Sequence, residues 1–567
     1  MNKGNTITAK QKTVNCTWKI TEDGTLVISP VKGTEGYLCG RDSIWPWAGR
    51  AFKRIRLEGH IIAPKNSSYM FSNCPELEDI SGLADLDISN TTHISRMFLG
   101  CWSLRTLAGI ENWNTKKIES ISDMFFGCTA LEDIAALENW DIKNVKKMCE
   151  LFGGCTSLSD IRALRKWNTE NTVDITFMFR DCTSLKSVEA LENWNIKNVR
   201  EMPRLFQGCT SLTDIRALRK WDVSSVDNMS FLFCGCASLK NISALQDWRA
   251  NCRQMAAMFR NCTSLESVSA LRYWNTGNIT EIAELFRGCA SLSDISALKY
   301  WDTGNITGMA NLFRECASLS DISALKEWNT KNVRIMSGMF RGCISLSNIS
   351  ALAEWQTENF HIATDTFRDC TSLEDASALA KWNIVTLINT EGMFRDCTSL
   401  KVIGGIEDWN VSRVMNMDFC FSNCDLESRK TLLDKWQKKN KAFRHSTAVA
   451  SEGNIFANND SPMACPRSGE FIGWKKCQDS KLVMLQIPAD AKRSSALGKK
   501  CRCDKAKVID IIDKYGKSIE KASSNFDTNF IYRKGDTVSV PDFDNDRFNE
   551  CAPGIHFFIN KEDAMNY

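Results

Sequence analysis

Apolar side chains recur along most of the chain with a spacing of 27 residues. Tryptophan occupies one position of this repeat in twelve successive units from Trp113 to Trp409, and every gap is 27 residues except the 26 between Trp248 and Trp274. Phenylalanine stands three residues before a cysteine in the same units, beginning with Phe71. A fixed period of this length predicts a repeat architecture in which each unit buries its apolar stripe against its neighbours.

The pattern within one unit, residues 289–316, predicts two local elements. Residues 292–301 have apolar side chains at every third position and suit a brief strand that enters a turn. Residues 306–313 have apolar side chains at i, i+3, i+6 and i+7, which is helix-like spacing. The Asp-Thr-Gly-Asn run at 302–305 offers N-cap chemistry followed by a turn.

Stacked copies of this unit would bury a continuous core, with a parallel sheet on one side and short helical turns on the other. At the parallel-strand spacing of about 4.8 Å, roughly 13–14 coils would form a rod on the order of 65 Å long. We interpret the tryptophan and phenylalanine columns as core spines. The alternative is that these rings form a platform for a carbohydrate or a cofactor.

The two ends of the repeat array predict caps, because an open solenoid end would expose its core and a sheet edge. Residues 1–69 are expected to be a β-rich N-terminal cap, with short strands and a turn between residues 16 and 63. The repeats occupy 70–424, and the amphipathic stretch within 425–444 is expected to be a C-terminal capping helix. The polar residues 445–463 are typical of a linker.

Residues 464–567 do not repeat and predict a small separate α+β domain. A strand is expected at 481–488, hairpins at 507–522 and 529–540, and a strand followed by a short helix capped at Asn560 at the end.

Composition narrows the function classes. The net charge is +3 with 25% charged residues, which argues against a dedicated nucleic-acid binder. No run of 18 apolar residues exists, so no membrane span is predicted. The first twenty residues have neither an apolar segment nor a cleavage site typical of a secretory signal, so the cytosol is the default expectation.

Cysteine is abundant, with 25 residues, but its placement argues against a disulfide framework. Parallel neighbours about 4.8 Å apart hold their Cβ vectors parallel, whereas a disulfide needs converging Cβ atoms about 3.8 Å apart. We interpret these residues as a reduced packing ladder, in preference to disulfides or metal. Fourteen cysteines share one repeat position: Cys74, Cys101, Cys128, Cys155, Cys182, Cys209, Cys236, Cys262, Cys289, Cys316, Cys343, Cys370, Cys397 and Cys424.

No catalytic motif stands out, and we predict no enzyme, no cofactor and no metal site. His556 with Cys551 is the best candidate for a nucleophile and base, but His556 lies in an apolar run and is better interpreted as a core or edge histidine. The spacings of the five cysteines between 465 and 551 do not match common zinc knuckles. The acidic run at 542–550 lacks the glycine and the final glutamate of a calcium loop and reads as a solvated loop.

The unit WNTKNVRIMSGMFRGCISLSNISALAEW at 328–355 resembles the BspA-like leucine-rich repeat, and the resemblance covers about residues 70–424. Residues 16–30 and 45–59 also resemble the cap that often precedes such arrays. The resemblance implies a right-handed leucine-rich-repeat stack, an α/β solenoid. It also implies a surface protein that adheres to host proteins or cells, which places the chain outside the cytosol.

The C-terminal stretch is similar to an uncharacterised domain appended to repeat proteins of bacteria and their viruses. The matching pieces include FIGWKK at 471–476, IPADAKRSS at 487–495 and GIHFF at 554–558. This resemblance assigns no chemistry to the domain.

Partner contacts are expected at positions that vary between repeats. One candidate is a charge-alternating band in which basic clusters two units apart flank an acidic residue, and the alternative interpretation is mutual neutralisation along a stacked face. The other candidate is a pair of neighbouring tyrosines. The residues are Arg162, Arg165, Lys166, Glu189, Arg216, Arg219 and Lys220 for the band, and Tyr273 and Tyr300 for the pair.

The leading hypothesis is therefore a monomeric, non-catalytic adhesion or interaction protein that binds a protein partner through its solenoid. The alternative is an intracellular scaffold or effector in which the repeats recognise a partner and the C-terminal domain acts, as an enzyme in one version of this hypothesis.

Overall fold

The computed structural model describes residues 15–38, 45–249, 251–439, 455, 470–495, 500–513, 517–525, 530–543, 554–558 and 564–565. The chain divides into two compact units, Met1–Ala457 and Asn458–Tyr567. Each unit has a hydrophobic core of its own.

The first unit begins with short strands, as the sequence predicts. Strands β1 (Cys16–Ile20) and β2 (Thr25–Pro30) form an antiparallel hairpin, and β4 (Arg54–Leu57) and β6 (Asp79–Gly82) extend it in parallel. A second, three-stranded parallel sheet contains β3 (Gly36–Tyr37), β5 (Ile61–Ile62) and β7 (Leu86–Asp87). The hairpin thus pairs with the otherwise open sheet edge of the first coils.

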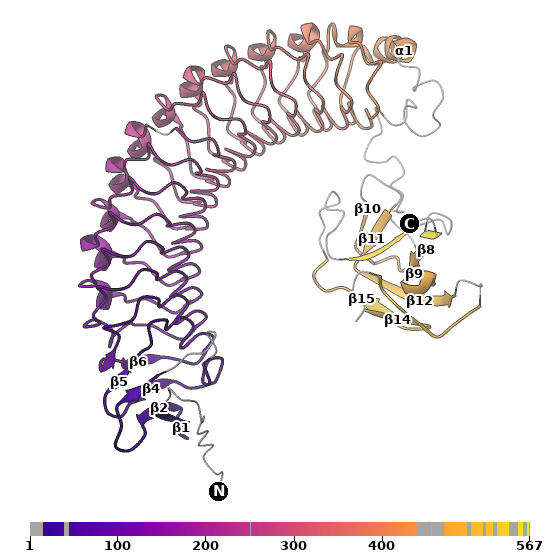
Figure 1. Cartoon of the computed structure of the whole chain (residues 1–567). Coiled ribbons are helices and arrows are strands. Elements are labelled where there is room, and N and C mark those ends of the chain that lie inside the picture. Colours follow the sequence, from indigo (N-terminus) through magenta and orange to yellow (C-terminus); the bar gives the residue numbers. More distant parts are fainter. Residues whose placement is uncertain are drawn as a thin grey trace. The chain divides into compact units, whose positions relative to one another are not determined.

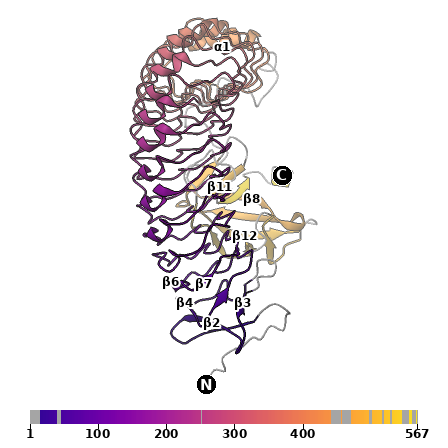
Figure 2. The same ribbon diagram turned by 60° about the vertical axis from the view of Figure 1, so that its left-hand side comes forward.

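Beyond these strands the coils stack in an arc, and short 3-10 helices follow its outer edge (Figures 1 and 2). A series of fourteen residues, one per coil from Asn66 to Asn416, is joined by single parallel β-bridges. The helices recur once per coil: η1 (Ala135–Leu137), η2 (Arg162–Lys166), η3 (Glu189–Leu191), η4 (Arg216–Lys220), η5 (Ser243–Asp247), η6 (Ser269–Leu271), η7 (Ser296–Tyr300), η8 (Ser323–Leu325), η9 (Ser350–Leu352), η10 (Ser377–Lys381) and η11 (Ile406–Asp408).

The helix within each unit was predicted in the wrong half. In the unit at residues 289–316 it is η7, which lies within residues 292–301, where a strand was predicted, whereas residues 306–313 form turns. Alternate N–H groups there, such as those of Asn311 and Phe313, donate to carbonyls of the next coil, and the residues between donate within their own coil. Asn311 and Glu315 have left-handed φ angles of 55° and 64°, which an α-helix excludes. The strand predicted in every unit is also wrong for most of the array, where single parallel bridges join the described coils after β7.

The polar run at 302–305 joins coils and does not cap a helix. The Thr303 hydroxyl donates to the carbonyl of Asn329 in the next coil at 3.1 Å, and the Asn305 amide donates to the carbonyl of Gly277 in the preceding coil at 2.6 Å. The Asp302 carboxylate accepts from the N–H of Gly304 at 3.1 Å. These bonds satisfy backbone groups that a turn would otherwise leave to solvent.

The aromatic columns are core spines, as predicted. Ring centroids of neighbouring phenylalanines from Phe71 to Phe421 lie 5.2–5.9 Å apart, whereas the stacked tryptophan pairs lie 6.0–6.4 Å apart. The wider spacing places tryptophan at a larger radius, next to the 3-10 helices of the outer edge. The phenylalanine column therefore lies nearer the inner edge of the arc.

The cysteine ladder is reduced and packed. All fourteen repeat cysteines have free thiols, and every one except the half-buried Cys424 is buried. Each thiol in the middle of the array donates to the carbonyl of a column phenylalanine in the preceding coil, thirty residues earlier except for Cys262, where the separation is 29. The Cys316 thiol donates to Phe286 at 3.1 Å. Burial raises the pKa of the Cys343 thiol to about 12, so the reactive thiolate is suppressed at neutral pH.

Helix α1 (Arg429–Lys439) packs against the last coil of the array and lies where the sequence predicts an amphipathic helix. Its Trp436 stands 27 residues after Trp409 and repeats the column's bond, donating from Nε1 to the carbonyl of Ile406 at 3.3 Å. The Trp436 ring also lies 6.0 Å from that of Phe421. The N–H of Phe421 donates to the carbonyl of Ile455, so a further residue pairs with the last coil.

The second unit is built on a seven-stranded sheet with the order β10-β11-β16-β8-β9-β12-β15, and β13 and β14 form a separate pair. Besides the 3-10 helix η12 (Gln478–Ser480), its described residues form these strands: β8 (Phe471–Lys476), β9 (Leu482–Ile487), β10 (Arg493–Ser495), β11 (Lys500–Cys503), β12 (Lys505–Ile512), β13 (Lys521–Ser523), β14 (Ile531–Arg533), β15 (Thr537–Ser539) and β16 (Ile555–Phe558).

One expected hairpin of this unit is present and one is wrong. In the hairpin expected at 507–522, Ile512 forms an antiparallel bridge with Ser518, and the N–H of Ile519 donates to the carbonyl of Ile511. Strands β14 and β15 do not pair with each other, because β14 pairs with β13 and β15 with β12. The intervening turn donates its Gly535 N–H to Val508, so the chain changes sheet there. Asn560, the expected cap of a final helix, lies outside the described residues; Ala564 and Met565 are helical.

Candidate interaction surfaces

The charge-alternating band lies on the outer edge, on helices η2, η3 and η4. All six of its cations form ion pairs, which favours the interpretation of mutual neutralisation. Exposed pairs of this kind each contribute only about 0–1 kcal/mol to stability. The pairs are Arg162–Asp160 (2.6 Å), Arg165–Glu189 (2.6 Å), Lys166–Glu138 (2.8 Å), Arg216–Asp214 (2.7 Å), Arg219–Asp247 (2.7 Å) and Lys220–Glu192 (2.7 Å).

Tyr273 and Tyr300 are adjacent on the outer edge, and Arg272 links them. Tyr273 is 60% exposed and Tyr300 46%. The Arg272 guanidinium carbon lies 4.1 Å from the Tyr300 ring centroid and 5.4 Å from that of Tyr273, and its Nη2 donates to the Tyr300 hydroxyl at 2.6 Å. The stack restrains two large aromatic side chains that are open to solvent.

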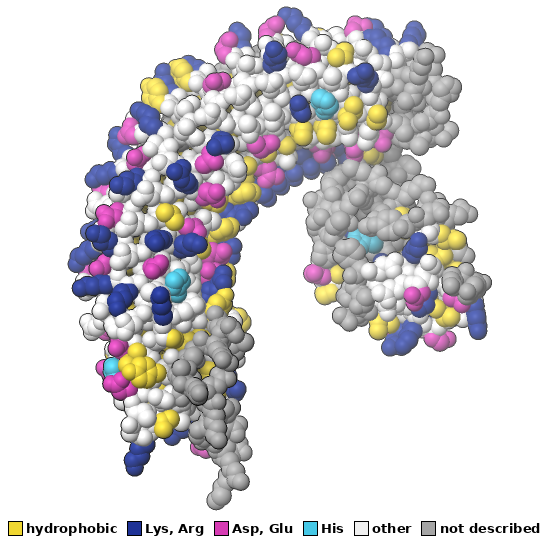
Figure 3. Space-filling model, viewed as in Figure 1, with side chains coloured by type: hydrophobic (Ala, Val, Ile, Leu, Met, Phe, Trp, Pro, Cys, Tyr) yellow, Lys and Arg dark blue, Asp and Glu magenta, His cyan; other side chains and the backbone are white. Residues whose placement is uncertain are grey.

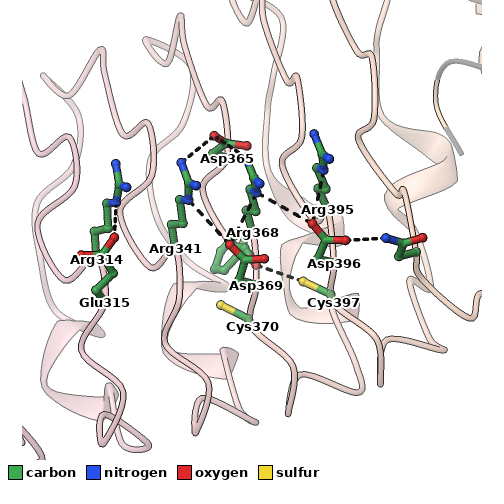
Figure 4. Close-up of polar contacts among 12 residues, drawn as sticks. Arg314, Glu315, Arg341, Asp365, Arg368, Asp369, Cys370, Arg395, Asp396 and Cys397 are labelled. Atoms are coloured by element: carbon green, nitrogen blue, oxygen red, sulfur yellow. Dashed lines mark hydrogen bonds and ion pairs between the residues drawn. The ribbon is translucent and has the colours of Figure 1, made fainter. Parts of the chain in front are cut away.

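A third surface, which the sequence analysis missed, is a row of arginines, each two residues before the repeat cysteine, in six successive coils. Figure 4 shows the last four of them. We call these residues the basic row. Exposure of their side chains falls steadily along the row from 32% to 4%. The row contains Arg260, Arg287, Arg314, Arg341, Arg368 and Arg395.

Carboxylates accompany the basic row. Glu284 lies between Arg260 and Arg287, at 2.7 and 3.0 Å. Glu315 contacts Arg314 at 3.0 Å. Burial lowers the pKa of Arg314, and the neighbouring guanidinium groups of Arg341 and Arg287 lower it further. In the last three coils, Asp365, Asp369 and Asp396 contact the remaining three arginines.

The basic row follows the phenylalanine column, since each arginine stands directly after a column phenylalanine. Its position is therefore on the inner side of the arc. Figure 3 shows basic and acidic side chains gathered along the inner edge, next to a strip of apolar side chains.

Glu391 lies four residues before Arg395, the last arginine of the basic row, and we expect it to make the stability of the protein depend on pH. Burial and then the charges of Asp365 and Asp418 raise the pKa of Glu391 from 4.5 to about 7. As pH rises, this carboxyl ionises near pH 4.5 in the unfolded chain but only near pH 7 in the folded chain. Its ionisation therefore lowers the free energy of unfolding progressively between pH 4.5 and 7, and the full loss is reached above pH 7. Glu391→Gln should therefore raise the urea midpoint above pH 7 and leave it unchanged near pH 4.

The matched control for this prediction is Glu138→Gln. The hydrogen bond from Lys166 lowers the pKa of Glu138, so removing its carboxylate should leave the midpoint equal or slightly lower at pH 7. If Glu391→Gln shifted the urea midpoint equally at pH 4 and pH 8, the raised pKa of Glu391 could not be the cause of the shift.

The second unit contains the histidine and the cysteines that the sequence analysis considered as catalytic or metal-binding residues. His556 lies in β16, paired with Arg502 of β11, and its carbonyl accepts from Lys475 Nζ at 3.2 Å. Cys477, Cys501 and Cys503 are buried, whereas Cys465 and Cys551 lie outside the described residues. In the described part of the chain, no group of three or more His, Cys, Asp or Glu side chains is arranged to hold a metal ion. No described helix is long and apolar enough to cross a membrane.

Several solved structures are similar to parts of the chain. A leucine-rich cell surface protein from Faecalibacterium prausnitzii A2-165 is 14% identical, with 77% of this chain and 98% of that chain covered and a TM-score of 0.29. A leucine-rich-repeat protein from Eubacterium ventriosum ATCC 27560 is 15% identical, with 60% and 95% covered and a TM-score of 0.26. These scores are too low to support the fold, which rests on the coil geometry itself. No curated protein sequence matches the chain.

Two families match the sequence. Residues 461–564 match a family of unknown function, DUF5758, which covers the second unit. Five overlapping matches to a repeat family run from residue 65 to residue 436, which is more than half of the 567 residues. The chain belongs to this repeat family, described as "Mycoplasma protein of unknown function, DUF285".

Proposed function

We propose that the protein is a non-catalytic binding protein that holds a protein partner through its solenoid, as an adhesion or interaction protein does. The observation that carries this proposal is the stack of Tyr273, Arg272 and Tyr300, which we call the tyrosine anchor. Tyrosine and arginine are the residues that most often dominate protein interfaces. A tyrosine that is already restrained loses little side-chain entropy on binding.

The proposed organisation has five parts: a cap at 1–69, the repeats at 70–424, a capping helix at 425–444, a linker at 445–463 and a C-terminal domain at 464–567. The band of Arg162, Glu189 and Arg216 is a secondary contact surface in this proposal. The separate core of the second unit supports the alternative, an intracellular scaffold in which that unit acts. Surface proteolysis of intact cells distinguishes the two, because a scaffold confined to the interior would not be cleaved.

Affinity capture tests the tyrosine anchor. The full chain and its Tyr273→Ala/Tyr300→Ala variant serve as baits, and proteins retained from surface extracts are quantified by mass spectrometry. Loss of an interface hot spot costs about 2 kcal/mol or more, which is roughly a thirtyfold weaker complex. We expect partners of the wild-type bait to be lost from the variant and kept by Lys326→Gln/Lys381→Gln, which removes two exposed charges outside the proposed surfaces. Equal retention by all three baits would refute the anchor.

A further inference from the structure

We infer that Arg260, Arg287 and Arg314, the first half of the basic row, form a second binding surface, which takes the carboxylate side chains of an acidic segment in a protein partner. This surface lies on the inner side of the arc and is distinct from the tyrosine anchor.

Charge balance singles out this half of the row. Its three arginines contact two carboxylates, Glu284 and Glu315. The side chain of Glu315 is 49% exposed, so water and salt screen its attraction for Arg314. The other half has three arginines and three carboxylates, and its guanidinium groups are more deeply buried. One further anionic group would balance the first half.

Hydrogen bonding in the first half is also incomplete. The buried Nε atoms of Arg260 and Arg287 have no hydrogen-bond partner among the described residues. Glu284 accepts from one terminal nitrogen of each guanidinium, at 2.7 and 3.0 Å. A guanidinium carries five N–H donors, so the terminal nitrogens retain capacity for another acceptor. The side chains of these arginines are 32% and 21% exposed, which leaves their ends within reach of a partner.

The surface beside these arginines is open to close approach. The residue four positions before each arginine is alanine, namely Ala256, Ala283 and Ala310, and all three are half-buried. In other coils this position holds larger groups, such as Glu391 and Asp418. An extended segment lying along the alanines could therefore reach the guanidinium groups without displacing a bulky side chain.

The guanidinium geometry favours carboxylates over a continuous polyanion. A planar guanidinium matches a carboxylate with two parallel N–H donors. Glu284 and Glu315 contact the same arginines, so a polymer with densely spaced phosphates or sulfates would also place negative charge against these two carboxylates. Separate carboxylates on an extended protein segment can meet the arginines and avoid those two residues.

Fluorescence anisotropy with the full chain tests this inference. The probe is a labelled decapeptide that alternates glutamate and serine, and a glutamine–serine peptide is its neutral control. We expect saturable binding of the acidic peptide alone, weakened about tenfold or more by Arg287→Gln/Arg314→Gln, since a charged hydrogen bond is lost at each site. Lys326→Gln/Lys381→Gln removes the same charge from exposed positions at the ends of η8 and η10, outside every proposed surface, and should leave affinity within about twofold.

Three outcomes overturn the inference: no binding by the wild type, equal binding by the wild type and Arg287→Gln/Arg314→Gln, or tighter binding of heparin or polyphosphate than of the peptide. Circular dichroism establishes that each variant is folded. If the glutamine variant does not fold, Arg287→Lys/Arg314→Lys replaces it, and we expect a several-fold loss because lysine keeps the charge without the paired donors. The Tyr273→Ala/Tyr300→Ala variant should bind the peptide normally, which separates this surface from the tyrosine anchor.

Discussion

Phe313→Ala is expected to lower the free energy of unfolding of the solenoid by about 3–5 kcal/mol, the usual cost of emptying a buried phenylalanine site. Phe313 is fully buried, and its ring lies 5.8 Å from the rings of both Phe286 and Phe340. The backbone hydrogen bonds between coils restrict collapse of the resulting cavity. Each coil contacts only its neighbours, so a defect in the middle weakens the coupling between the two halves of the array.

Urea unfolding followed by tryptophan fluorescence measures this loss. Because tryptophans occur throughout the array, a broader or two-step transition would report that the halves have separated. Tyr300→Ala removes an exposed aromatic side chain from the preceding part of the same coil and is the matched control, with an expected cost within about 1 kcal/mol. Equal destabilisation by the two substitutions would contradict the role assigned to the phenylalanine column.

The core of the solenoid could be predicted from the sequence because the same side chain returns at the same position in every unit. A tryptophan or phenylalanine repeated at 27-residue intervals must meet its copies if the units stack. The helix position could not be derived in this way. Apolar spacings of three and four fit an α-helix, but they also fit the ladder of turns that leads to Phe313, and left-handed residues such as Asn311 settle the choice.

The candidate surfaces were only partly predictable for a similar reason. Variable charged positions on the outer edge are visible in the sequence, but their partners are not. Arg165 pairs with a glutamate 24 residues later, whereas Lys166 pairs with one 28 residues earlier, and this choice depends on side-chain geometry at the coil edges. The basic row was also visible as an arginine two residues before the cysteine in six successive units. The exposure of its side chains falls from 32% at Arg260 to 4% at Arg395, and the repeat period does not reveal this gradient.

Gly109→Ala is expected to destabilise the protein by about 3 kcal/mol, although a comparison of the repeats recommends it. Alanine fills this position in ten consecutive later units, from Ala136 to Ala378, and substitution toward such a consensus usually stabilises a protein. Gly109 differs because its φ angle is +109° and an added Cβ would lie 2.6 Å from both the carbonyl oxygen of Ile80 and the Cα of Ser81. The left-handed backbone costs about 1–2 kcal/mol for alanine, and overpacking adds about 1–3 kcal/mol.

Gly109 differs from the later alanines because of the coil that precedes it in the stack. Residues 79–82 form strand β6, whereas in the later coils a 3-10 helix stacks on a 3-10 helix and leaves room for the alanine methyl group. Gly342→Ala is the matched control, since Gly342 has a φ angle of +74° but its Cβ would meet neighbours at an ordinary 3.5 Å. The free energy of unfolding, measured by urea denaturation, should therefore fall by about 1 kcal/mol for Gly342→Ala and distinctly more for Gly109→Ala. Equal shifts would mean that backbone conformation alone sets the cost, and that the junction between cap and repeats tolerates the consensus residue.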